Sequence, residues 1–189
     1  MPCSRTTHPS GSHVHILGAS GSGTTTLAAA LAVRLGHAHL DTDDFFWLPT
    51  VPKFQTVRPQ EERVALLASA LGQLGGWVLS GSLCGWGDVF IPRFELVVFI
   101  YLPPDVRMAR LARREVTRYG ADAIAPGGTH HAQYEKFMTW AAAYETGNVS
   151  RTLAIHEQWL ATLPCPVLRL TTVAPTAAHL EQVLARLAK

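Results

Sequence analysis

The 189-residue sequence lacks the features typical of secreted, membrane-bound and nucleic-acid-binding chains. Charged residues make up only 16% of it, and its net charge of +2 is too small to indicate nucleic acid or an anionic membrane as a partner. No apolar run approaches the roughly 20 residues that span a bilayer. The three cysteines are far apart, without metal-ligand or redox spacing, which favours a reducing cytoplasm.

The sequence does contain enough apolar residues for one sizeable core. Hydrophobic residues make up 48%, and a chain of this length is typical of a single domain. Residues 1–12 are polar and contain Gly, Pro and Ser, so we expect a flexible tail, and they lack the apolar stretch of a signal peptide. Residues 13–189 are therefore expected to form a single domain.

Short apolar segments alternate with segments of helical periodicity along the chain. Strands are expected at residues 13–17, 37–40, 77–79, 95–102 and 167–170, and helices at 25–35, 60–74, 105–118, 131–144, 150–163 and 176–187. The strand at 95–102 has no polar alternation, which is typical of a sheet covered on both faces. The order predicts an α/β three-layer sandwich with a five-stranded parallel sheet, in which ligands bind at the carboxyl ends of the strands.

Residues 18–25, which we call the phosphate loop, follow the first strand and open a helix. They match the pattern G-x-x-x-x-G-K-[ST] at every position but one, and backbone N–H groups of such a loop cradle phosphate beside the helix N-terminus. The predicted nucleotide-binding residues are Gly18, Ala19, Ser20, Gly21, Ser22, Gly23, Thr24, Thr25 and Thr26. A Gly/Ser turn of no function is the alternative, and the strand and helix on either side argue against it.

Thr24 replaces the lysine that normally reaches the outer phosphates. Phosphoryl transfer depends on positioning and charge stabilisation, so another cation must compensate, or the loop binds nucleotide without fast chemistry. Five arginines crowd the helix after the fourth strand, namely Arg107, Arg110, Arg113, Arg114 and Arg118. Little acid is nearby, so either phosphate neutralises Arg110 and Arg114 or the helix has a solvated basic face.

Three acids follow the second strand, and Ser80 stands at the end of the third strand, where many phosphate-loop proteins place an acid. We expect the hydroxyl of Thr25 to ligate Mg²⁺ and one of the carboxylates Asp41 and Asp43 to hold a metal-bound water. Another of these carboxylates could orient or deprotonate an acceptor hydroxyl. The alternative is a capped, solvated turn.

The expected acceptor pocket adds Phe46, Arg58 and Arg93 to Asp43. Each has a plainer alternative: the aromatic residues 45–47 could belong to the core, and Arg93 could lie on the surface. Residues 119–131 are rich in glycine and could form a short lid or a simple connection.

Together these residues resemble the nucleoside and nucleotide kinase branch of the P-loop NTPase fold, which includes adenylate and shikimate kinases. The resemblance spans roughly residues 14–172 in element order. It implies that ATP and Mg²⁺ are bound, that Asp41 serves the metal and Asp43 the acceptor hydroxyl, as in the Asp-x-Asp of shikimate kinase. It also implies that Arg110 and Arg114 are the arginines at the lid base that contact ATP and the transferring phosphoryl group.

The favoured function is therefore an adenylate kinase-like phosphotransferase, in which Arg110, Arg114 and Asp43 are catalytic. The alternative is a non-catalytic or regulatory nucleotide-binding protein of the same fold. Partners are expected to be a nucleotide and a small-molecule acceptor. The sequence leaves open the acceptor, the choice between ATP and GTP, and the oligomeric state.

Overall fold

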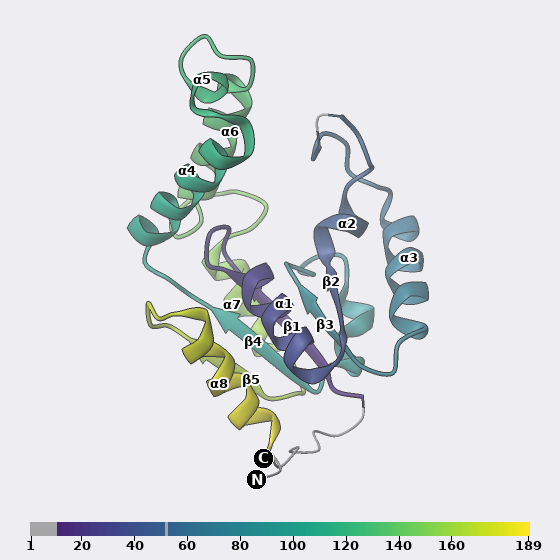
Figure 1. The fold of residues 1–189 in the computed structure, drawn as a ribbon. Coiled ribbons are helices and arrows are strands. Elements are labelled where there is room, and N and C mark those ends of the chain that lie inside the picture. The colour runs from purple at the N-terminus through teal and green to yellow at the C-terminus, as the bar shows by residue number, and fades with distance from the viewer. Residues whose placement is uncertain (1–10, 52) are drawn as a thin grey trace.

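The computed structural model describes residues 11–51 and 53–189, and its centre is a parallel sheet (Figure 1). The strands are β1 (His13–Gly18), β2 (Ala38–Asp41), β3 (Trp77–Ser80), β4 (Leu96–Ile100) and β5 (Val167–Leu170). Their order across the sheet is β2-β3-β1-β4-β5, and every neighbouring pair is parallel. The predicted five-stranded parallel sheet is confirmed.

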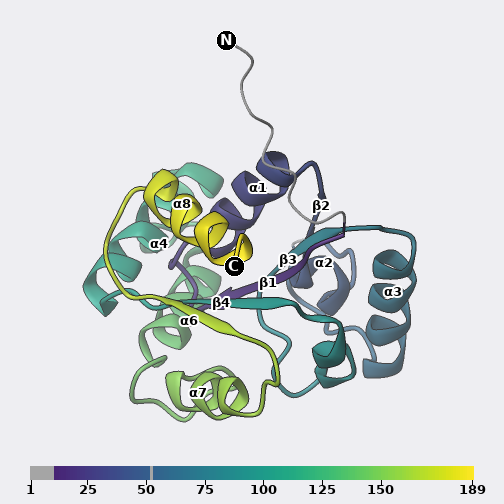
Figure 2. The same cartoon turned by 90° about the horizontal axis from the view of Figure 1, so that it is seen from below.

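Helices cover both faces of this sheet, which completes the predicted three layers (Figure 2). One face packs against α1 (Thr24–Leu35) and α8 (Thr176–Leu187), and the other against α3 (Gln60–Gly72) and α7 (Leu153–Ala161). The central strands are buried on both sides, as β4 shows with five buried residues out of five. The unbroken apolar run that predicted β4 therefore reflects two separate cores.

Three further helices form an arm that projects beyond the carboxyl edge of the sheet in Figure 1. The arm consists of α4 (Pro104–Tyr119), α5 (Ala121–Ile124) and α6 (His131–Ala142). Residues 119–131, expected as a lid or a connection, form its tip, where the N–H of His130 donates to the carbonyl of Ala123 at 2.8 Å.

Several short elements escaped the sequence analysis because they have too few residues to show a period. They are α2 (Thr42–Phe46), α5 and the 3₁₀ helix η1 (Asp88–Arg93). The helix expected at 150–163 begins only at Leu153, because the hydroxyl of Thr152 caps it by accepting from the N–H of Ile155.

The tail expected for residues 1–12 lies mostly outside the described residues. Ser12 itself is buried, and its carbonyl accepts from the N–H of Trp77, so ordered structure precedes β1. Within 11–51 and 53–189, none of the helices has the length and apolar character needed to cross a membrane.

Candidate active site

The phosphate loop turns sharply between β1 and α1, and two glycines make the turn possible. Gly21 and Gly23 have φ of 84° and 97°, in the left-handed region. A Cβ on Gly21 would also lie 2.7 Å from the carbonyl oxygen of Arg107, so only glycine fits there. Gly23 is the N-cap of α1 and offers no side chain to the first N–H groups of the helix. Those groups are left to bind an anion.

Arg107 of α4 fastens this loop to the arm. Its side chain is fully buried, and Nη1 donates to the carbonyl of Ser20 at 3.1 Å. Nη2 donates to both carboxylate oxygens of Glu145 at 2.7 Å. The guanidinium also lies 5.1 Å from the ring centre of Tyr144. Arg107 therefore supports the loop from behind and is not available to a ligand.

Arg110 and Arg114, predicted to act together, have different surroundings. Nη1 of Arg110 lies 3.9 Å from the position that a Cβ on Gly23 would occupy, so it reaches the phosphate loop. Within the described part of the chain it makes no hydrogen bond or ion pair. Arg114, by contrast, donates to Glu115 at 2.9 Å and lies 5.4 Å from the ring centre of Phe137 in α6.

Asp41, Thr25 and Ser80 form one hydrogen-bonded group where β2 and β3 end. The hydroxyls of Thr25 and Ser80 both donate to Oδ2 of Asp41, at 2.9 and 2.8 Å. Nε2 of His39 lies 3.0 Å from Oγ of Ser80, so it donates to Ser80 while Ser80 donates to Asp41. The expected metal residues Thr25 and Asp41 are thus brought together, and Ser80 occupies the place of the absent acid.

The donor set at this position fits Mg²⁺ better than a softer metal. Thr25 and Asp41 offer oxygen atoms only, and Mg²⁺ usually takes one or two protein oxygens together with phosphate and water. Over the described ranges, no group of three His, Cys, Asp or Glu side chains is arranged to hold a metal without such a ligand.

Asp43 lies at the start of α2 and faces an arginine that the sequence analysis missed. Oδ1 of Asp43 is 3.9 Å from Nη2 of Arg151, in the segment before α7. Desolvation raises the pKa of Asp43, Arg151 opposes the rise, and the charge of Asp41 adds to it. A carboxylate with a raised pKa is suited to accept a proton near neutral pH.

Phe46 packs against the core, and two arginines also lie beside its ring, so the structure leaves its predicted place in the acceptor pocket as a prediction. Its ring packs against the core on the α3 side of the sheet. The guanidinium of Arg63 lies 4.5 Å from its ring centre, and that of Arg151 lies 5.4 Å away. The sequence did contain a signal for Arg63, which precedes Leu67 and Leu71 at helical spacing on the buried face of α3. Arg151 had no such signal.

Arg58 and Arg93 do not face the phosphate loop. Arg58 donates to the carbonyls of Phe45 and Trp47 at 3.0 and 3.4 Å, so it braces the end of α2. Arg93 donates to the carbonyl of Leu71 near the amino end of β3. That end is opposite to the phosphate loop, so the geometry brings Arg93 to neither the nucleotide nor the acceptor.

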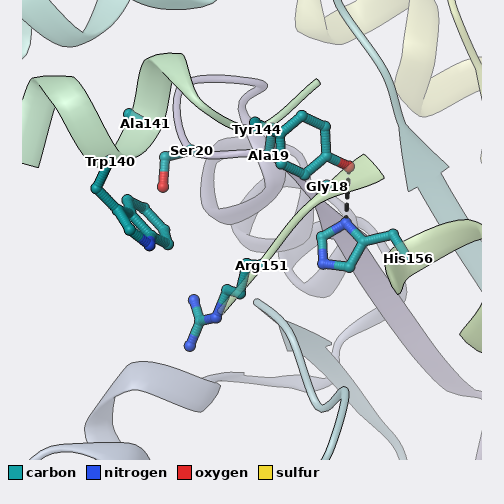
Figure 3. A pocket seen from close by; sticks show the side chains of 8 residues that line it. All are labelled: Gly18, Ala19, Ser20, Trp140, Ala141, Tyr144, Arg151 and His156. Carbon is teal, nitrogen blue, oxygen red and sulfur yellow. Dashed lines mark hydrogen bonds between the residues drawn. The ribbon is translucent and has the colours of Figure 1, made fainter. Parts of the chain in front are cut away.

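A pocket lies next to the first half of the phosphate loop, and residues of the arm and of α7 also line it (Figure 3). Its lining residues are Gly18, Ala19, Ser20, Trp140, Ala141, Tyr144, Arg151 and His156. The buried ring of His156 lies 2.8 Å from the Tyr144 hydroxyl and 3.2 Å from Oγ of Ser82. Burial lowers the pKa of His156 to about 4, and Arg151 adds to that effect, so its ring is neutral near pH 7.

Comparison with known proteins relates this arrangement to a family. The sequence model described as "AAA domain" matches residues 14–126. Over 173 residues the chain is 44% identical to the uncharacterized protein YqaC of Bacillus subtilis (strain 168), a match that covers 91% of this chain and 95% of that protein. It is 31% identical over 115 residues to a cytidylate kinase of Archaeoglobus fulgidus, covering 54% of this chain and 61% of the kinase.

Solved structures agree on the fold. A shikimate kinase from Acinetobacter baumannii, in complex with shikimate, superimposes with a TM-score of 0.52 over 94% of this chain and 92% of that one. The two sequences are 16% identical, so the likeness concerns the fold alone. The phosphate loop of this chain therefore occupies a P-loop kinase fold.

Proposed function

This chain belongs to the AAA-domain family of P-loop kinase folds, and from that premise we propose that it transfers the γ-phosphoryl group of ATP to a hydroxyl of a small molecule. The nucleotide's phosphates bind the N–H groups of the phosphate loop, including those of Thr24, Thr25 and Thr26 at the start of α1. Thr25 and Asp41 would hold Mg²⁺, which would supply positive charge to the triphosphate.

The observation that carries this proposal is the unpaired guanidinium of Arg110 beside Gly23. A cation that has no partner among the described residues and lies against the phosphate loop replaces the charge that Thr24 does not supply. Arg114 lies one turn further along α4, where it is paired with Glu115. We expect Arg114 to exchange this partner for the triphosphate when the nucleotide is bound. The positive charge thus comes from α4 rather than from the loop itself.

The reaction uses Asp43 as the base. As the acceptor hydroxyl attacks the γ-phosphorus, the bond from phosphorus to the β–γ bridging oxygen breaks. ADP leaves with that electron pair, and Asp43 takes the hydroxyl proton. The N–H of Asp43 donates to Oδ1 of Asp41 at 3.0 Å, which supports this role because the base would lie close to a triphosphate bound through Mg²⁺ at Asp41. A cytoplasmic location accords with the free thiols of Cys84 and Cys165.

Phosphotransfer to a panel of nucleotides and small alcohols tests the proposal. Mg-ATP should bind, and at least one acceptor should be phosphorylated with equimolar ADP formation. If ATP binds with Mg²⁺ but no acceptor in a broad panel is phosphorylated, the non-catalytic nucleotide-binding function replaces this one.

A further inference from the structure

We propose that the acceptor is an anion, whose carboxylate or phosphate group is held by Arg63 and Arg151 beside the ring of Phe46. This inference rests on the proposed phosphotransfer and specifies its substrate class. A buried arginine on the acceptor side of the site has no counter-ion among the described residues, and this observation leads to the proposal.

Arg63 is 8% exposed, yet its guanidinium has no carboxylate within ion-pair distance and makes no hydrogen bond with any described residue. Nε is buried and unpartnered. Its neighbours are the faces of two rings, Phe46 at 4.5 Å and Trp86 at 5.1 Å. Burial lowers the pKa of Arg63, and the charge of Arg151 lowers it further. A buried cation is costly unless it is paired, so a partner from outside the chain is expected.

Arg151 supplies the second charge and links this site to the chemistry. Its guanidinium lies 5.4 Å from the centre of the Phe46 ring, while Nη2 is 3.9 Å from Oδ1 of Asp43. In Figure 3 its guanidinium points away from the ring of His156 and lies below Ser20 and Trp140 in the view. Arg151 therefore lies near both the proposed base and the ring that Arg63 covers.

This order of groups defines what the acceptor must look like. Its hydroxyl lies against Asp43, and its anionic group lies a few bonds away, where two guanidinium groups converge on one ring. Two like charges held so close repel each other until an anion lies between them. Guanidinium forks suit carboxylate and phosphate oxygens in particular. A neutral alcohol would leave Arg63 without a counter-ion among the described residues and Arg151 with Asp43 alone at 3.9 Å.

The test measures anion binding while the phosphate loop is filled. The full chain is saturated with Mg²⁺ and a non-hydrolysable ATP analogue, and calorimetry then compares glycolate with ethylene glycol and glycerol 3-phosphate with glycerol. At least one anion should bind more tightly than its neutral analogue, by about 10- to 100-fold. Preference for glycolate would indicate a carboxylate acceptor, and preference for glycerol 3-phosphate a phosphate monoester.

Arg63→Met and Arg151→Met should each weaken that binding by about 10- to 100-fold, and Arg63→Lys by less. Arg113→Met, at an exposed position of α4, should leave it unchanged. The inference is overturned if neither anion is preferred over its neutral analogue, or if both arginines can be replaced without effect. In that outcome binding of the ATP analogue still stands as evidence for the nucleotide site, whereas loss of nucleotide binding itself would contradict the proposed function.

Discussion

Arg107 in the arm and Arg63 in α3 are both buried, but the two regions treat them in opposite ways. Arg107 has a carboxylate at 2.7 Å on Nη2 and a loop carbonyl on Nη1. Among the described residues, Arg63 has only the faces of two aromatic rings beside its guanidinium. Arg107 thus joins parts of the chain, whereas Arg63 is the arginine that we propose to bind a ligand.

The same contrast runs through the whole site. On the nucleotide side, paired groups fix the phosphate loop, and Arg110 is left free to contact phosphate. On the acceptor side, Arg63 and Arg151 share one ring, and the nearest carboxylate to Arg151 is Asp43 at 3.9 Å. The arm therefore pairs its buried arginine within the chain, whereas the segments around Phe46 leave Arg63 unpaired among the described residues, as the proposed anion site requires.

The largest effect is expected at Asp43. Asp43→Asn should lower kcat by about 100- to 10,000-fold, because it removes the base, while the affinity for Mg-ATP stays within a factor of about two. In the wild type, kcat should fall as the pH falls through the raised pKa of Asp43, since only the ionised carboxylate accepts a proton. Steady-state kinetics against pH would check this, and an acid limb that persists in Asp43→Asn would exclude Asp43 as the base.

Stability measurements should separate the two buried arginines. Arg107→Met should lower the free energy of unfolding by about 3–5 kcal/mol, because Glu145, 16% exposed, loses its partner. Arg63→Met should leave it unchanged within about 1 kcal/mol or raise it, because an unpaired buried charge disappears. Urea titrations of the ligand-free variants measure both changes. If the two substitutions lower the free energy of unfolding equally, the two buried arginines do not differ in their contribution to stability.

Low pH should weaken the packing around His156, which lines the pocket between the phosphate loop, the arm and α7. The pKa of His156 is about 4 when folded against a usual 6.5, so the folded state keeps the ring neutral. The contribution of His156 to the free energy of unfolding is complete above pH 6.5. It falls by about 3 kcal/mol as the pH drops to about 4. His156→Gln, which can still reach Tyr144 and Ser82, should lose this share of the pH dependence in urea titrations. An unchanged pH dependence would show that the fold does not lower the pKa of His156.

The sequence predicted the parts of the molecule whose signals are local. The phosphate loop is a contiguous motif and β4 a contiguous apolar run, so both could be recognised without knowing the fold. Asp41 was recognisable because it directly follows a strand. Its bonds to Thr25 and Ser80 join three segments that only the sheet order brings together.

The acceptor side could not be predicted because its members are isolated residues in unrelated segments. Arg58 and Arg93 were predicted to line the acceptor pocket, yet both donate to backbone carbonyls instead. Arg151 reaches Asp43 only because the chain returns from the arm before α7. A single arginine on an otherwise apolar face of α3 was the one available signal for this region.

The central claim is that Arg110 supplies the charge missing at Thr24, and calorimetric binding of Mg²⁺ with a non-hydrolysable ATP analogue tests it without an acceptor. Arg110→Met should weaken binding by about 10- to 100-fold, and Arg113→Met should not. Thr24→Lys should restore most of the loss in the Arg110→Met background, yet be neutral or harmful in the wild type. If Arg110→Met binds normally, and Thr24→Lys tightens binding equally in both backgrounds, Arg110 does not replace the lysine.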